Sequence, residues 1–172
     1  MAHFLFPSEY YESTYAIDFQ KYYDLGYRGI LFDIDNTLVP HDKMHDDRSR
    51  ALFKKLKDIG FKVCFVSNNE EPRVKEFNDE VNVEYVYKAG KPKAEGFLKG
   101  VKKLNIKRST TIFIGDQLFT DIWGANNAKI HSILVNPLDK EIKYYIVLKR
   151  ILEFPIKKMY LTKHKIKSDI KA

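Results

Sequence analysis

The chain has a single cysteine, Cys64, and no apolar run long enough to cross a bilayer, which needs about 20 such residues. One cysteine excludes an internal disulfide, and its place in the apolar segment 62–66 favours a buried side chain in a reduced, cytoplasmic protein. Residues 1–7 lack the basic lead and the apolar length of a secretory signal peptide. We therefore expect a cytoplasmic protein, either free in solution or peripheral to a membrane.

Acidic residues are scarce near the C-terminus. Of the net charge of +7, six units lie in residues 139–172, where ten lysine and arginine residues face four acidic ones. The rest of the chain is close to neutral. Because this basic tail also carries aromatic residues, it suits an anionic partner such as a membrane surface or a nucleic acid. The alternative is a packed helix with a solvated basic edge.

Internal repeats and low-complexity segments are also absent, and 172 residues fit one domain. Short apolar segments typical of buried strands alternate with segments of helical periodicity. Strands are expected at residues 28–34, 61–66, 83–87, 110–114 and 130–135. Helices are expected at residues 46–59, from Pro72 onward, at 93–104 and at 119–128. This order predicts an α/β fold: a doubly wound, Rossmann-like parallel sheet of about five strands, with helices on both faces.

The pattern divides the chain into three segments: an N-terminal helical lead-in (1–27), a core (28–137) and a basic C-terminal helical extension (138–172). In the lead-in, residues 12–25 are expected to form one helix. In the extension, a helix is expected over residues 141–154. Pro155 should end it, because proline cannot donate the hydrogen bond that continues a helix.

Reactive side chains follow four of the expected strands, in the order Asp33 and Asp35, Ser67, Lys91 and Asp116. Ligands bind at the carboxyl ends of parallel strands, so these side chains should meet at one edge of the sheet. Buried aspartates are costly unless they are paired, and Mg²⁺ prefers carboxylate, water and phosphate oxygens. A serine hydroxyl and a lysine ammonium group bind phosphoryl oxygens. The strand ends therefore predict a Mg²⁺-dependent phosphoryl-transfer site.

Each of these residues also has a purely structural interpretation. The aspartates and Ser67 can cap strands or helices. Lys91 can be a solvated lysine, in which case Lys88 or Lys93 would bind the phosphate. Two loop histidines leave the same choice between a metal or acid role and simple solvation: His41 and His45.

The four motifs together resemble those of the haloacid dehalogenase-like (HAD) phosphatase superfamily. The resemblance covers roughly residues 28–137, and it is strongest to the capless subfamily IIIA, YqeG-type branch. A lone Asp-x-Asp-x-Thr motif would be weak evidence for this resemblance, but four motifs in order are much more specific. The segments that carry the resemblance are Asp33-Ile34-Asp35-Asn36-Thr37-Leu38-Val39, Ser67-Asn68-Asn69, Ala89-Gly90-Lys91-Pro92, and Gly115-Asp116-Gln117 through Thr120-Asp121.

The resemblance implies a role for each carboxylate. Asp33 would attack phosphorus and form an aspartyl-phosphate intermediate. Asp35 would protonate the leaving oxygen and then activate water, and its presence favours a phosphatase over proteins that keep the intermediate longer. The implied Mg²⁺ ligands are Asp33, Asp35 through its backbone carbonyl, Asp116, and Asp121 directly or through water.

The resemblance also implies a set of residues that hold the phosphoryl group: Thr37, Ser67, Asn68 and Lys91. Neither the loop after Thr37 nor the stretch between Ser67 and Lys91 has room for a lid domain. The expected site is therefore open and suits large substrates, namely proteins, nucleic-acid ends or lipid head groups. Small molecules remain candidates if an oligomer closes the site.

Three functions follow from these observations. The first is a Mg²⁺-dependent phosphomonoester hydrolase, and the resemblance to mitochondrial and plastid enzymes makes phosphatidylglycerophosphate a candidate substrate. The second is a binding module that keeps the scaffold and docks on RNA or a protein through the basic tail, although nothing requires such a module to keep both Asp33 and Asp35. The third is a receiver domain, which the missing aspartate at the end of the third strand disfavours.

Overall fold

The computed structural model describes residues 3–139 and 144–171, with side chains described for 4–139 and 146–163. Its centre is a single sheet in which every neighbouring pair of strands is parallel, in the order β1-β6-β5-β2-β3-β4. The strands are β1 (Glu9–Tyr11), β2 (Gly29–Phe32), β3 (Lys62–Val66), β4 (Glu84–Val86), β5 (Thr111–Gly115) and β6 (His131–Val135). The predicted doubly wound α/β fold is confirmed.

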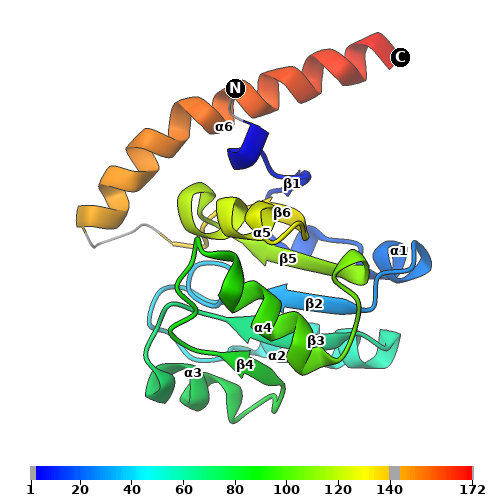
Figure 1. Ribbon diagram of the computed structural model, residues 1–172, viewed down its shortest axis with the longest axis vertical. Coiled ribbons are helices and arrows are strands. Elements are labelled where there is room, and N and C mark those ends of the chain that lie inside the picture. Colours follow the sequence, from blue (N-terminus) through cyan, green and yellow to red (C-terminus); the bar gives the residue numbers. More distant parts are fainter. Residues whose placement is uncertain (1–2, 140–143, 172) are drawn as a thin grey trace.

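Helices cover both faces of the sheet (Figure 1). One face packs against α1 (Phe19–Asp24), α2 (Asp47–Ile59) and α3 (Glu71–Asn78). The other packs against α4 (Ala94–Leu104) and α5 (Trp123–Asn127). The central strands are buried on both sides, which explains why they are continuously apolar in sequence. No separate lid domain is inserted into the described part of the chain.

Helix α2 shows how local sequence sets these elements. Asp46 caps it: the Asp46 side chain accepts a hydrogen bond of 2.7 Å from the Ser49 backbone N–H, and the Ser49 hydroxyl bonds back to the cap. Leu52 and Leu56 lie on its buried face. Gly60 ends it with φ of 105°, in the left-handed region that favours glycine. The predicted helix over 46–59 and its glycine cap are confirmed.

At the ends of the chain, one strand was not expected and two expectations are wrong. The sheet has a sixth strand, because residues 9–11 pair with β6, and so short a strand has no periodicity to reveal it. The helix expected over 12–25 is split into a 3₁₀ turn (Thr14–Ala16) and α1, which starts afresh at its cap Asp18. The helix expected to stop at Pro155 continues through it, as α6 (Tyr144–Lys171).

Pro155 is tolerated because it lies on the exposed side of α6, where the carbonyl group that loses its donor can meet water. The helix predicted over 119–128 also differs in detail. It begins with a π-helical turn, η4 (Leu118–Ile122), before α5. Among the described residues, no helix combines the length and the apolar character needed to cross a membrane.

The strand order fixes where a ligand can bind. From β2 the chain builds outward through β3 and β4, and from β5 it builds the opposite way, so β2 and β5 are neighbours at the point where the winding reverses. Phe32 pairs in register with Ile114 of β5 and with Phe65 of β3. The residues that follow these strands therefore emerge side by side in the crevice at the carboxyl ends.

Candidate active site

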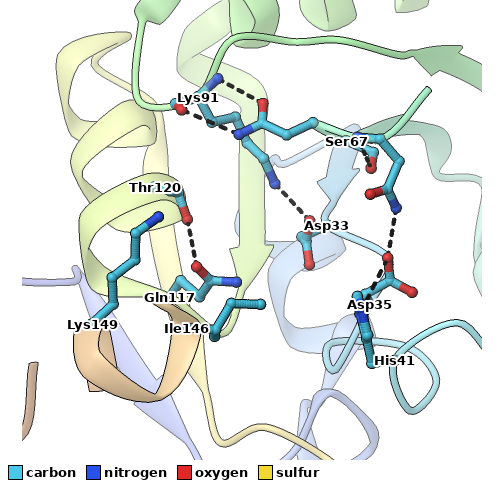
Figure 2. Close-up of a pocket in the computed structure, with 11 residues that line it drawn as sticks. Asp33, Asp35, His41, Ser67, Lys91, Gln117, Thr120, Ile146 and Lys149 are labelled. Carbon is cyan, nitrogen blue, oxygen red and sulfur yellow. Dashed lines mark hydrogen bonds and ion pairs between the residues drawn. The ribbon is translucent and has the colours of Figure 1, made fainter. Parts of the chain in front are cut away.

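A pocket of about 160 Å³ opens at this crevice (Figure 2). Its walls come from the loops after β2, β3, β4 and β5, together with the first turns of α6. The lining residues are Asp33, Asp35, His41, Ser67, Asn68, Asn69, Lys91, Gln117, Thr120, Ile146 and Lys149. The structure thus brings together side chains from all four predicted motifs, and it adds α6 as a wall.

Lys91 is buried between two carboxylates. Its Nζ atom donates to Asp33 Oδ1 at 2.6 Å and to Asp121 Oδ1 at 2.7 Å. Only 3% of its side chain is exposed. The alternative lysines are on the surface, where Lys88 pairs with Glu70. Lys91 is therefore the lysine of this loop that reaches the pocket.

Gly115 makes this arrangement possible. A Cβ atom on it would lie 2.6 Å from the Cβ atom of Asp121, so only glycine allows the close approach of that side chain. In this position Asp121 Oδ2 accepts hydrogen bonds from the backbone N–H groups of Asp116 (3.2 Å) and Gln117 (3.0 Å). Asp121 thereby ties Lys91 to the end of β5.

Burial dominates the electrostatics. It raises the pKa of Asp33 to about 7, although Lys91 opposes the shift. Burial also raises the pKa of Asp116 well above its usual range, against the attraction of Arg150. For Lys91, burial lowers the pKa, but Asp121 and Asp33 outweigh it and leave the pKa above its usual value. The site thus holds more negative charge than its buried surroundings favour, and a bound cation would relieve that cost.

Asp116 faces a cation that the sequence did not point to. The guanidinium group of Arg150, on α6, donates to the Asp116 side chain and also to its backbone carbonyl. Arg150 is braced in turn by Glu153 at 3.2 Å, and Glu153 accepts from the Phe119 backbone N–H at 3.1 Å. These contacts fasten α6 to the strand ends.

Asp35 points to a different side of the pocket from Asp33. It accepts from Asn69 Nδ2 at 2.6 Å and from Arg73 Nη2 at 3.0 Å. The backbone N–H of Asp42 adds a bond of 3.1 Å. Arg73, on α3, was also not predicted as a site residue, because nothing in the sequence distinguishes it from other helix-surface arginines. These three donors hold the Asp35 carboxyl group at the rim of the pocket.

The residues predicted to hold phosphate have different surroundings. Ser67 is buried at the pocket wall, and its Oγ atom accepts from the Asn69 backbone N–H at 3.1 Å. Thr37 donates to Asp33 Oδ2 at 3.2 Å or to Asp116 Oδ1 at 3.3 Å. Asn68 bonds the backbone N–H (2.8 Å) and carbonyl (3.2 Å) of Lys91. Asn68 therefore holds the Lys91 loop in place beside the pocket.

The two histidines differ in position. His41 lines the pocket, with Nδ1 3.8 Å from Asp35 Oδ2. His45 is buried away from it, stacked on Phe77 at 3.8 Å and bonded to Ser49 at 2.9 Å. Burial lowers the pKa of His45, which fits a neutral packing residue. The chemical role left open for these histidines can therefore apply to His41 only.

The carboxylates can accommodate a hard cation. Oxygen atoms of Asp33, Asp116 and Asp121 all lie within 4.8 Å of one another. The donor set is oxygen only, as Mg²⁺ prefers. The side chain of Asp35 lies outside this group, beside His41 instead, so a metal contact of Asp35 through its backbone stays a prediction.

Comparisons with known proteins show the family to which the chain is related. The sequence model of the haloacid dehalogenase-like hydrolases matches residues 40–129, beginning just after the Asp33 motif. A relative from Bacillus subtilis (strain 168), named probable phosphatase YqeG, is 38% identical over 136 residues, which cover 78% of this chain and 79% of that protein.

A second relative, the chloroplastic/mitochondrial phosphatidylglycerophosphate phosphatase 1 of Arabidopsis thaliana, is 25% identical over 190 residues. The match covers 97% of this chain and 53% of that protein, so the chain spans about half its length. Among solved structures, a HAD phosphatase from Thermococcus onnurineus superposes with a TM-score of 0.51 at 15% identity, covering 67% of this chain and 90% of that one. This last similarity shows that the fold is shared.

Proposed function

Because the chain belongs to the haloacid dehalogenase-like hydrolase family and is a phosphatase, we propose that it hydrolyses phosphomonoesters with Mg²⁺, through an aspartyl-phosphate on Asp33. The observation that carries the proposal is the buried contact of 2.6 Å between Asp33 Oδ1 and Lys91 Nζ at the wall of the pocket. It presents a carboxylate nucleophile beside a fixed positive charge, and phosphoryl transfer depends mainly on such positioning and charge neutralisation.

The residues divide the reaction between them. An Asp33 carboxylate oxygen forms the new bond to phosphorus while the bond to the leaving oxygen breaks. Asp35, held by Asn69 and Arg73, donates a proton to that leaving oxygen. It then takes a proton from the water that attacks phosphorus and releases Asp33. Lys91 neutralises charge on the phosphoryl group throughout.

Asp33, Asp116 and Asp121 would hold Mg²⁺, together with the backbone carbonyl of Asp35. When bound, the ion neutralises phosphoryl oxygens and the excess carboxylate charge. Asp116 must then exchange its contact with Arg150, or share it with the ion. The hydrogen bonds from the Asp116 and Gln117 backbone N–H groups keep Asp121 oriented.

Phosphatidylglycerophosphate is the candidate substrate. The name of the Arabidopsis relative supports it, and so do two of the residues that α6 adds to the pocket wall. There Ile146 offers an apolar contact and Lys149 offers a positive charge (Figure 2). A leaving group that is both apolar and anionic, as in an anionic lipid, matches this pair better than a neutral alcohol does.

The test is phosphate release by the purified protein from an aryl phosphate and from phosphatidylglycerophosphate in mixed micelles, with Mg²⁺ or with EDTA. We expect Mg²⁺-dependent release that Asp33→Asn lowers by more than about a thousandfold. Asp58→Asn, an exposed aspartate on α2, is the control and should retain activity. Release from the aryl phosphate alone would refute the lipid substrate, and release that persists in EDTA or in Asp33→Asn would refute the mechanism.

A further inference from the structure

Helix α6 turns three charged side chains, Arg150, Glu153 and Lys157, toward the protein. Arg150 and Glu153 are engaged at the strand ends, and Lys157 Nζ donates to Asn136 Oδ1 and lies 4.8 Å from the centre of the Tyr10 ring. Ile146 and Tyr160 are buried on the same side. The inward face of this helix therefore mixes apolar and charged contacts, whereas the buried stripe of an ordinary surface helix is mainly apolar.

The outward face of α6 is apolar. Its side chains are among the most exposed large hydrophobic residues of the molecule, with Leu148 at 57%, Ile151 at 63%, Leu152 at 56% and Phe154 at 67%. A groove of about 460 Å³ lies beside this face toward the C-terminus. It is lined by Phe154, Lys157, Lys158, Leu161 and Thr162. An apolar surface of this extent marks an interaction site.

The charges around this face all have one sign. Lys158 is exposed along it, and Lys149 lies where it meets the catalytic pocket. Lys163 is also exposed, and its Nζ atom lies 5.5 Å from the centre of the Phe6 ring at the edge of the helix. Among the described side chains of α6, the acidic one is Glu153, and it points inward. An exposed apolar strip flanked by lysines, with no outward carboxylate on the described part of the helix, is complementary to an anionic interface with an apolar interior.

We propose that the outward face of α6 docks on an anionic lipid bilayer. The helix would lie in the plane of the interface, with Leu148, Ile151, Leu152 and Phe154 among the acyl chains and the lysines near lipid phosphates. Figure 1 shows that α6 extends beyond the body of the domain, so a flat surface can reach it.

Docking in this way would also fix the position of the catalytic pocket relative to the bilayer. Ile146 and Lys149 belong to the first described turns of the same helix and line the pocket. The mouth of the pocket would then open at the level of the head groups. A phosphate group on a lipid could enter it without leaving the membrane, so the open site would gain a cover from the surface on which it works.

The experiment is flotation of the whole chain with vesicles of phosphatidylcholine alone or mixed with phosphatidylglycerol. The double variant Ile151→Glu/Leu152→Glu tests the face, and Leu98→Glu, 40% exposed on α4, is the matched control. We expect the parent chain to float with the mixed vesicles and to float less with vesicles of phosphatidylcholine alone. The affinity of the double variant for the mixed vesicles should fall by at least about tenfold, because two apolar contacts are lost and two negative charges are added. Leu98→Glu should bind like the parent.

Hydrolysis of a soluble aryl phosphate is measured beside each flotation. A parent chain that hydrolyses it but does not float with anionic vesicles would overturn the docking surface and leave the catalytic proposal standing. A chain that floats but does not hydrolyse would do the opposite. Equal flotation of the double variant would place the contact elsewhere. Self-association that the double variant abolishes, with no flotation, would assign the face to a second copy and overturn the proposal.

Discussion

Replacing Lys91 tests the buried charge network of the site, because one ammonium group there serves both the stability of the fold and the proposed chemistry. The substitution Lys91→Met keeps most of the side-chain volume but removes the ammonium group between Asp33 and Asp121. Both carboxylates are then left buried without their common partner. Breaking a buried ion pair from one side costs about 3–5 kcal/mol. For a protein of this size, that lowers the melting temperature by about 6–20 °C.

The loss should depend on pH and on metal. The pKa of Asp33 is already raised by burial, to about 7, and removing Lys91 raises it further. A carboxyl group whose pKa is higher in the folded than in the unfolded protein destabilises the fold as the pH rises between the two values. The deficit of the variant should therefore be largest near pH 8 and shrink toward pH 5. Mg²⁺ should also reduce it, because the ion neutralises the same carboxylates.

The assay is thermal unfolding in EDTA and in Mg²⁺, at pH 5 and pH 8, for the parent and two variants. The second variant, Lys54→Met, removes a lysine from an exposed pair with Asp58 and should leave the melting temperature unchanged. If Lys91→Met melted at the temperature of the parent at pH 8 in EDTA, the inferred buried charge network would be refuted. The network would also be refuted if the melting-temperature difference between Lys91→Met and the parent were larger at pH 5 than at pH 8.

Three further outcomes follow from the site. Arg73→Gln should lower kcat about tenfold on an alkyl phosphate but less on a nitrophenyl phosphate, whose leaving group needs no proton from Asp35; equal losses would contradict a positioning role. Arg150→Gln should bind Mg²⁺ more tightly by calorimetry, because Asp116 is freed from the guanidinium group; weaker binding would speak against that competition. Cys64, whose pKa burial raises to about 12, should resist alkylation at pH 8 until the chain is unfolded, and rapid labelling of native protein would contradict its burial.

The core of the fold could be predicted because its signals are local. Each central strand is a short apolar run, and caps such as Asp46 and Gly60 mark helix ends within a few residues. Strand β1 could not be predicted, since its three residues form a strand only through pairing with β6, more than 120 positions away. Likewise, α6 continues past Pro155 because the break falls on its exposed side, and the sequence does not reveal that orientation.

The residues of the site also fall into those that the sequence could predict and those that it could not. Asp33, Lys91 and Asp116 could be placed because each follows a strand, and strand ends meet in a parallel sheet. Arg73 and Arg150 could not, because each comes from a helix whose direction toward the pocket is set by packing. The inward ion pairs and the apolar outward face of α6 were missed for the same reason, since its composition alone fits either orientation.

The most direct test of the central claim is a search for phosphate on Asp33. The protein is mixed with a phosphomonoester and Mg²⁺, quenched in acid within the first turnover, digested, and examined by mass spectrometry. We expect one phosphoryl group on the peptide that contains Asp33, absent when EDTA replaces Mg²⁺ and absent in Asp33→Asn. Rapid turnover with no phosphorylated peptide, or phosphate on another residue, would contradict the account.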